Sequence, residues 1–344
     1  MINRVLIVGL GSIGSRHLRL ARHLLPNAEI KVLRHQETNS VPEFSNGCMS
    51  SIVEALEFSP QIAVIANPAT FHLKTAQSLA EAGVNLLIEK PLSDSVEGIS
   101  NLIETCRVGK TTLATGYNLR FSPSMQHFRQ ALKNGIIGEI FSVRCEVGQY
   151  LPTWRPSTDY RQGVSANRIL GGGALLELSH EIDYLRWIFG DVEWVRSTLS
   201  KQSNLEIDVE DSASLTIGFT PNSAGKQVLS TINLDFIRHD YTRHCTVIGE
   251  NGTLTWDGVL GRVMIYAKDS PFWVELYSHQ PVRDETYIEE WHDFLLSIQE
   301  NKLPFVTGED GLRVIEIIEA VRESSQTGIQ VQVDRLSTTK EFSA

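Results

Sequence analysis

The sequence has few cysteines, no excess of positive charge and no long apolar run. Its four cysteines stand alone at positions 48, 106, 145 and 245, which excludes zinc-type spacing and a disulfide framework, so we expect no metal and a reducing cytoplasm. The net charge of −10 disfavours nucleic-acid partners. No segment approaches the roughly 18 apolar residues of a membrane span, and the first residues do not resemble a secretory signal.

The 344 residues suit two domains, and the pattern of the first 120 residues indicates a parallel sheet. Short apolar strands are predicted at 4–8, 29–33, 62–66, 85–89 and 111–116. Helical periodicity fills the intervals, at about 13–25, 51–57, 71–82 and 95–107. Strands that alternate with helices at this spacing predict an α/β, doubly wound dinucleotide-binding domain over residues 1–120.

The pattern changes over residues 121–344, where alternating apolar and polar positions become common. A helix at 123–134 is followed by alternating runs at 140–150, 192–201, 212–219, 227–236, 244–248, 252–256 and 262–267. Such alternation, with turn residues between the runs, is typical of antiparallel strands. Further helices are predicted at 179–189, 287–300 and 308–326. We therefore expect an α+β domain with a large, mostly antiparallel sheet.

A glycine-rich turn follows the first strand and opens the first helix. It reads Gly9-Leu-Gly11-Ser12-Ile13-Gly14, which is G-x-G-x-x-G. In a dinucleotide site the first glycine permits the tight turn, the second lets the backbone approach a pyrophosphate, and the third lets helix and strand pack closely. The helix N-terminus then offers free N–H groups to phosphates. The alternative is a tight turn that binds no ligand.

The end of the second strand bears on the choice of cofactor. An acidic residue there usually accepts a hydrogen bond from the ribose 2′-hydroxyl of NAD, but here the strand ends Val32-Leu33-Arg34-His35. The cation of Arg34 suits a 2′-phosphate, which favours NADP(H). In the alternative, Arg34 is solvated and Glu37 reaches the ribose, giving NAD(H).

Three polar segments follow predicted strands, at 67–72, 89–91 and 116–121. Ligands of open parallel sheets bind just outside the carboxyl ends of the strands, so we expect these segments to line one crevice. Lys90 directly follows an apolar run, where low dielectric lowers a lysine pKa and lets its proton move. The alternative is an ordinary strand-end lysine paired with Glu89.

A second cluster surrounds His180. On one helix, Glu177 and Asp183 each lie three residues from His180 and would share its face. A carboxylate beside an imidazole raises and orients its basicity, which suits a general base. The alternative is a histidine that caps or packs locally.

Together these segments resemble the glucose–fructose oxidoreductase / inositol dehydrogenase (Gfo/Idh/MocA) family over nearly the whole chain. The motifs that carry the resemblance are Gly9-x-Gly11-x-x-Gly14, Asn67-Pro68, Glu89-Lys90-Pro91, Gly116-Tyr117-Asn118-x-Arg120-Phe121 and Gly171-Gly172-Gly173…His180-x-x-Asp183. The resemblance implies a catalytic lysine at Lys90, a cis bond before Pro91, and an acid/base at His180 followed by the acid Asp183. Where the family often has an aspartate this chain has Leu176, so Glu177 is the candidate for that role.

The resemblance also implies contacts and partners. The cofactor-binding residues would be Gly9, Gly11, Ser12, Ile13, Gly14, Arg34, Asn67, Pro68, His72, Glu89, Lys90 and Asn118. The helix at 308–326 would return to pack near the first domain. The second domain would bind a sugar-type substrate and pair through its sheet into a homodimer or homotetramer.

The stretch 150–161 is rich in aromatic residues and arginine, which suits stacking on a sugar and pairing with an acid or phosphate. It is similar to relatives from sialic-acid-type and nucleotide-sugar pathways. The candidate substrate contacts are Tyr117, Arg120, Trp154, Arg155, Tyr160 and Arg161. The alternative for this stretch is a surface loop with turn prolines.

These features predict an NAD(P)-dependent oxidoreductase that acts on a hydroxyl carbon of a sugar, amino-sugar, nucleotide-sugar or polyol. Two alternatives stay open. One is a cofactor-binding sensor or scaffold without catalysis, which would need neither Lys90 nor His180. The other is a lyase or isomerase that recycles a tightly held NAD.

Overall fold

A computed structural model describes residues 2–34 and 41–336. The chain forms two compact units, and neither is one continuous stretch of sequence. The first takes in the chain up to Tyr117 together with Glu290–Ile315 and Leu336, and the second comprises Asn118–Glu289 and Glu316–Arg335. No helix among the described residues is long and apolar enough to cross a membrane.

The first unit is built on a six-stranded parallel sheet in the order β3-β2-β1-β4-β5-β6. The strands are β1 (Arg4–Val8), β2 (Glu29–Leu33), β3 (Gly47–Met49), β4 (Ile62–Ile65), β5 (Asn85–Glu89) and β6 (Leu113–Gly116). The expected doubly wound sheet is confirmed, with one strand more than predicted, because β3 lies in the polar stretch between β2 and the next helix. The strand order reverses between β1 and β4, and ligands of such sheets bind at this switch point.

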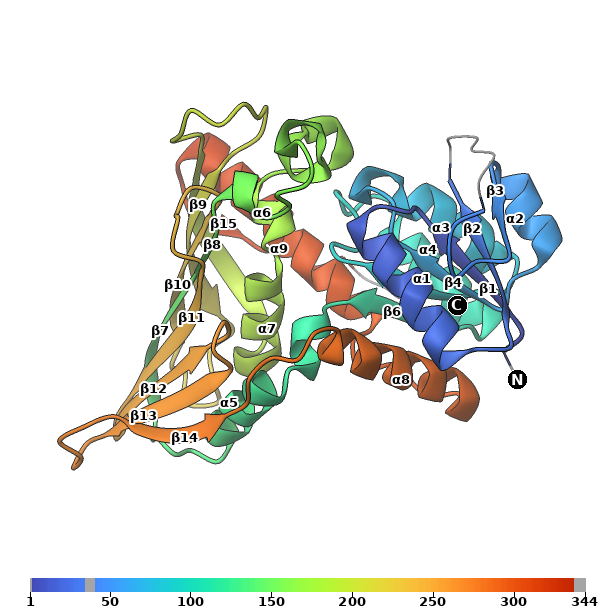
Figure 1. Ribbon diagram of the computed structural model, residues 1–344. Helices are drawn as coiled ribbons and strands as arrows, with labels where there is room; N and C mark the ends of the chain where they lie inside the picture. The colour runs from blue at the N-terminus through green and yellow to red at the C-terminus, as the bar shows by residue number, and fades with distance from the viewer. Residues whose placement is uncertain (1, 35–40, 337–344) are drawn as a thin grey trace, which may run out of the picture. The chain divides into compact units, whose positions relative to one another are not determined.

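Helices surround this sheet (Figure 1), and nearly every residue of its central strands β1, β4 and β5 is buried. They are α1 (Ser12–Leu24), α2 (Ile52–Phe58), α3 (His72–Glu81) and α4 (Ile99–Gly109). Residues of α8 (Glu285–Glu300) from Glu290 onward also belong to this unit. Every residue of β4 is buried, which explains why its sequence is a continuous apolar run rather than an alternating one.

The second unit is built on a nine-stranded sheet in the order β14-β13-β12-β11-β7-β10-β9-β8-β15. Its strands are β7 (Ile140–Gly148), β8 (Val192–Ser200), β9 (Ser212–Phe219), β10 (Leu229–Asp235), β11 (Thr242–Gly249), β12 (Gly252–Asp257), β13 (Arg262–Ala267), β14 (Val274–Ser278) and β15 (Val331–Gln332). All neighbours are antiparallel except β7 and β10, which run parallel. The expected large, mostly antiparallel sheet is confirmed, and β14 and β15 are additions to it.

Helices cover one face of the nine-stranded sheet (Figure 1). They are α5 (Pro123–Lys133), α6 (Ala174–Glu177), α7 (His180–Phe189) and the later part of α9 (Gly308–Thr327). Short 3-10 turns lie at Ala69–Phe71 in the first unit and at Asn118–Phe121, Leu151–Thr153, Tyr160–Gln162, Val164–Ala166 and Arg168–Leu170 in the second.

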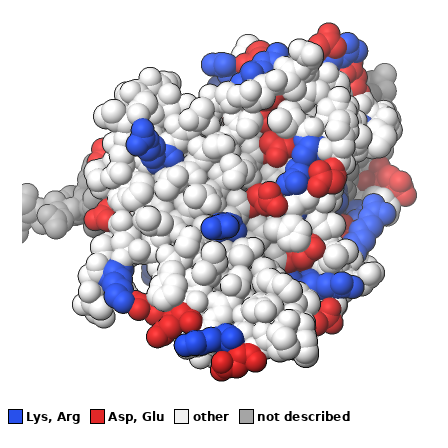
Figure 2. Space-filling model, turned by 90° about the vertical axis from the view of Figure 1, so that its left-hand side faces the viewer, with Lys and Arg blue, Asp and Glu red and all other residues white. Residues whose placement is uncertain are grey.

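No described helix of the second unit covers the opposite face of this sheet (Figure 1). A row of paired residues crosses it from β9 to β12, and we call it the threonine row: Thr216, Thr231, Arg144, Thr246 and Thr255. Their strand neighbours, such as Val143 and Cys145, are buried on the helix-covered face. Figure 2, which looks onto this side of the molecule, shows a broad area of uncharged residues.

The first turns of α9 belong to the first unit. Thr115 of β6 donates its backbone N–H to Val306 and its hydroxyl to the carbonyl of Thr307. A side chain at Gly311 would overlap Thr115 and Leu92, so this close approach of helix and strand requires glycine. The end of β6 is therefore held by residues almost 200 positions later.

Candidate functional site

The three glycines of the glycine-rich turn have different surroundings, since two are packed against backbone atoms and one is not. Gly9 has a φ of +85°, which favours glycine, and its N–H donates to the carbonyl of Leu33 at 2.9 Å. A Cβ on Gly14 would overlap the carbonyl oxygen of Gly9, whereas a Cβ on Gly11 would meet nothing within 4 Å. Gly9 and Gly14 thus have tight surroundings, and the backbone at Gly11 faces open space.

Helix α1 begins directly after Gly11 and has no side-chain N-cap hydrogen bond. Its N-cap is Gly11, which has no side chain to accept a hydrogen bond, and its first turn, with Ser12 and Ile13, contains no acidic residue. The N-cap residue therefore supplies no acceptor to the leading N–H groups of this 13-residue helix, an arrangement that suits a phosphate. At the end of β2, the backbone N–H of Arg34 donates to Met49, while His35 and Glu37 lie outside the described residues.

His72 ties the Asn67-Pro68 segment to the end of β5. A Cβ on Gly9 would touch the backbone of Asn67, so this segment borders the glycine turn. The His72 ring places Nε2 2.7 Å from the carbonyl of Asn67 and Nδ1 3.1 Å from that of Pro91. Burial lowers the pKa of His72, whereas the two carbonyl contacts act in the opposite direction. The peptide bond between Lys90 and Pro91 is cis, as the family resemblance implied.

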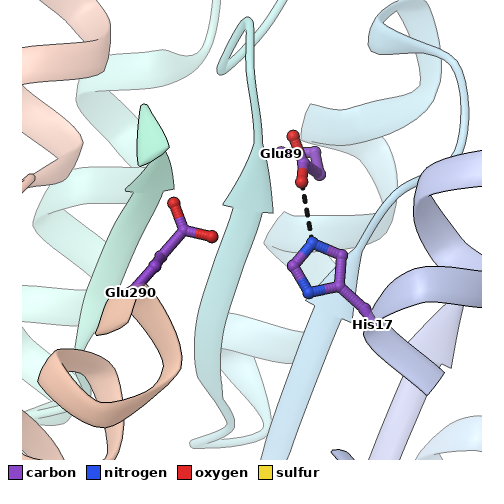
Figure 3. A group of neighbouring side chains, drawn as sticks. All are labelled: His17, Glu89 and Glu290. Carbon is purple, nitrogen blue, oxygen red and sulfur yellow. Dashed lines mark hydrogen bonds and ion pairs between the residues drawn. The ribbon is translucent and has the colours of Figure 1, made fainter. Parts of the chain in front are cut away.

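Glu89, at the last position of β5, is buried and accepts two hydrogen bonds. Its Oε1 lies 2.7 Å from Nε2 of His17, which is on α1 (Figure 3). Its Oε2 accepts the backbone N–H of Lys90 at 3.1 Å. A Cβ on Gly116 would lie 3.1 Å from the Cα of Glu89, so the end of β6 is adjacent. The glycine-turn helix and the strand that ends before Lys90 are therefore joined through one carboxylate.

Three residues around this carboxylate are absent from the sequence-based predictions. They are His17, Trp291, whose indole N–H donates to Nδ1 of His17 at 3.0 Å, and Glu290, which lies beside the pair. His17 lies on the buried side of α1, which is a local signal. Its partner Trp291 is 274 positions away, and no sequence pattern links the two.

In the second unit, His180 is the first residue of α7 and only 9% exposed. The expectation that Glu177 and His180 share one helical face is wrong. Helix α6 ends at Glu177, and Leu178 has φ −103° and ψ 25°, so the chain breaks before α7 begins. Glu177 accepts a hydrogen bond from the hydroxyl of Ser165 at 3.1 Å.

Asp183 forms a buried, bidentate ion pair with Arg120. Nε and Nη2 of Arg120 donate to the two carboxylate oxygens at 2.9 and 2.6 Å, and both side chains are at most 2% exposed. The guanidinium also lies 5.7 Å from the ring centre of Trp187 on α7. Nearby, the amide of Asn118 donates to the hydroxyl of Thr286. Arg120 and Asp183 therefore fix the start of the second unit to α7.

The other candidate substrate residues differ in how they are engaged. Tyr117 is fully buried, and Trp154 is partly exposed with its indole N–H on the carbonyl of Gln149. Arg161 is exposed and paired with Asp159 and Glu206, and the hydroxyl of Tyr160 accepts the N–H of Glu206. Exposed Arg155 has no ion-pair partner within residues 2–34 and 41–336.

Comparison with known families matches both units. Residues 3–117 match the model described as oxidoreductase family, NAD-binding Rossmann fold. Residues 129–333 match that described as oxidoreductase family, C-terminal alpha/beta domain. The chain belongs to the Gfo/Idh/MocA oxidoreductase family. The Gfo/Idh/MocA resemblance inferred from the motifs is confirmed, and so is a nicotinamide-dependent oxidoreductase with a Rossmann domain.

Relatives of this Gfo/Idh/MocA chain extend over its full length. It is 23% identical to a myo-inositol 2-dehydrogenase from Thermotoga maritima, over 97% of this chain and 99% of the relative. A levoglucosan dehydrogenase in complex with NADH and levoglucosan has the same fold, with a TM-score of 0.81, 21% identity and coverage of 97% and 100%. The WlbA dehydrogenase from Bordetella pertussis, in complex with NADH and UDP-GlcNAcA, gives a TM-score of 0.77 at 21% identity, covering 98% and 100%.

Proposed function

We propose that this oxidoreductase transfers a hydride between a nicotinamide cofactor and a hydroxyl-bearing carbon of a sugar, amino-sugar, nucleotide-sugar or polyol. The observation that carries the proposal is the anchoring of Lys90 at the end of β5. His72 and Glu89 hold the backbone on either side of it to the segment beside the glycine turn and to α1. Support for the substrate class comes from the relatives, whose names refer to inositol, levoglucosan and a nucleotide sugar.

The residues around the glycine turn fit a dinucleotide. The open backbone at Gly11 and the uncapped N-terminus of α1 would receive the pyrophosphate, and Asn67 and Pro68 border the turn. When bound, the nicotinamide accepts or donates the hydride. We propose NADP(H) as the preferred form because Arg34 ends β2 where an acid would select NAD(H).

Oxidation of an alcohol releases a proton in addition to the hydride. We assign that proton to the imidazole of His180, acting as general base, and we assign orientation of the alcohol oxygen to the ammonium of Lys90. Asp183 then acts indirectly, because its two oxygens are taken by Arg120 and the pair fixes the helix that His180 begins. A catalytic role for Glu177 stays a prediction.

The stretch after β7 is proposed to recognise an acidic or phosphorylated group of the substrate. Arg155 is the candidate cation because it is exposed and unpaired among the described residues, whereas Arg161 is already held by Asp159 and Glu206. Trp154, which is partly exposed, would contact the apolar face of a sugar ring. No observation favours the sensor or the lyase alternative.

We further propose that the chain forms a homodimer or homotetramer through the open face of the nine-stranded sheet. The threonine row crosses the middle of this face with a single charged member, Arg144. Depletion of charged residues is a feature of the cores of protein interfaces.

Substitution of Lys90 and His180 tests the proposed chemistry. Lys90→Met and His180→Ala should each lower kcat about 100-fold or more, the usual contribution of positioned proton transfer, and leave NADH affinity within a few-fold. The assay is nicotinamide absorbance with a panel of sugars, sugar acids, nucleotide sugars and polyols. Lys74→Met, an exposed lysine on α3, is the matched control. Turnover near that of the control in either variant would exclude the assigned role.

A further inference from the structure

Two buried carboxylates lie close together in the first unit. Glu89 is 6% and Glu290 3% exposed, and each places an oxygen within 4.8 Å of the other and of His17. Figure 3 shows the carboxyl group of Glu290, on α8, directed toward the His17–Glu89 pair. Two negative charges at this separation repel strongly where water is excluded, so the pair is expected to hold a proton.

The hydrogen bonds show which carboxyl group holds the proton. Glu89 accepts N–H groups from His17 and from the backbone of Lys90, and such donors stabilise a negative charge. Neither carboxyl oxygen of Glu290 has a hydrogen-bond partner among the described residues. The charge therefore belongs on Glu89 and the proton on Glu290.

The tautomer of His17 argues against a metal ion between these three residues. An indole N–H can only donate, so Nδ1 of His17, which receives it from Trp291, carries the lone pair. The ring proton is then on Nε2, the nitrogen that faces Glu89. A metal at that nitrogen would require loss of the one N–H proton of the ring, whereas a proton on Glu290 requires no change in His17.

We propose that Glu290 is a neutral, protonated positioning residue that keeps Glu89 bonded to His17 and to the backbone of Lys90. Through Glu89 it sets the end of β5 and the orientation of α1 behind the glycine turn. This role rests on the proposed function only where it concerns Lys90 as a catalytic group. The proton itself follows from the geometry of the first unit.

Burial and two neighbouring carboxylates favour the neutral form of Glu290. Burial, then the charge of Glu89 and then that of Asp293 on the same helix raise its pKa well above 4.5. Nδ1 of His17 accepts the indole N–H of Trp291, and β6, which ends beside Glu89, carries no titratable side chain. Folded Glu290 thus holds its proton more tightly than the unfolded chain does. Its contribution to stability is complete below pH 4.5 and is lost as pH rises toward the folded pKa.

Glu290→Gln tests the proposal, because the amide is neutral at every pH and has nearly the shape of the protonated acid. Glu289→Gln, an exposed neighbour on α8, is the matched control. Infrared spectra of the wild-type protein at neutral pH should contain the band of a buried protonated carboxylic acid. The control should keep this band and Glu290→Gln should lose it. The midpoint of thermal unfolding should fall toward alkaline pH in the wild type and the control, and less steeply in Glu290→Gln.

NADH affinity by fluorescence completes the test. Glu290→Gln should bind NADH within about twofold of the wild type at neutral pH, and it should keep that affinity at higher pH than the wild type does. Glu290→Ala should bind NADH more weakly than the wild type at neutral pH.

A wild-type protein without the infrared band would overturn the proposal, and so would an unfolding midpoint that depends equally on pH in all variants. So would stoichiometric divalent metal in the purified protein that Glu290→Gln loses. None of these readouts needs a substrate, so a failed dehydrogenase assignment would leave them unaffected. If Glu290→Gln does not fold, the wild-type band and its loss at alkaline pH decide the question.

Discussion

At the residue scale, the hydrogen-bond and ion-pair partners of a side chain decide whether that side chain can also contact a substrate. The sequence predicts that Asp183 supports His180 and that Arg120 contacts the substrate. In the structure Arg120 and Asp183 bind each other, and each carboxylate oxygen of Asp183 accepts a hydrogen bond from the guanidinium. Removing one member of a buried ion pair typically costs about 3–5 kcal/mol, because the other charge is left uncompensated. Such a pair is suited to fixing helix α7 rather than to exchanging partners with a substrate.

The proposed preference for NADP(H) rests on one residue, Arg34. A charge-assisted hydrogen bond contributes about 1.5–3 kcal/mol, so Arg34→Ala should weaken NADPH binding roughly 10- to 100-fold and leave NADH binding nearly unchanged. Dissociation constants measured by nicotinamide fluorescence check this. Arg107→Ala, an exposed arginine on α4 paired with Glu104, serves as the control. An equal loss for both cofactors, or none, would remove the basis for NADP preference.

At the element scale, the glycines of the turn have separable tasks. Gly14 keeps α1 against the strand-to-helix turn, where a Cβ would overlap the carbonyl of Gly9, whereas Gly11 has free space beside it. The first constraint belongs to folding. The second has no counterpart in the packing of the described residues, and the proposed approach of a pyrophosphate to the backbone would account for it.

Alanine at these two positions separates the tasks. Gly14→Ala should lower the unfolding midpoint, because the helix must shift to relieve the overlap. Gly11→Ala should keep the wild-type midpoint and lower NADH affinity at least tenfold, since its methyl group occupies the space assigned to the pyrophosphate. Thermal unfolding and fluorescence titration of both variants provide the comparison. Loss of stability in Gly11→Ala with unaltered affinity would contradict the assigned phosphate site.

The elements that the sequence predicts well include the strands formed by short continuous apolar runs, such as β1, β4 and β5. The three strands it misses lie toward sheet edges. They have two to five residues and too few buried positions to produce a pattern. The break between α6 and α7 is also invisible, because leucines on both sides continue the helical pattern. Local motifs locate Lys90, but its surroundings depend on contacts such as that between His17 and Trp291, which only folding creates.

At the scale of the whole molecule, the open sheet face predicts self-association. Thr246→Glu places a negative charge in the middle of the threonine row. In a dimer or tetramer that uses this face, each copy would bury this charge in the interface, which costs free energy. Its molar mass by light scattering should fall to that of a smaller species with little change in unfolding midpoint. Ser223→Glu, in the exposed turn between β9 and β10, should behave like the wild type. A wild-type protein that is already monomeric would exclude this interface.

The return of Glu290–Ile315 to the first unit has a consequence for synthesis of the protein. Residues up to Tyr117 leave the ribosome early, but Trp291 and the segment that pairs with the end of β6 follow more than 170 residues later. Until then His17 lacks its indole donor and one edge of β6 is uncovered. A truncated product that stops before α8 would therefore carry the complete glycine turn and still lack the contacts that stabilise the strand ends behind it.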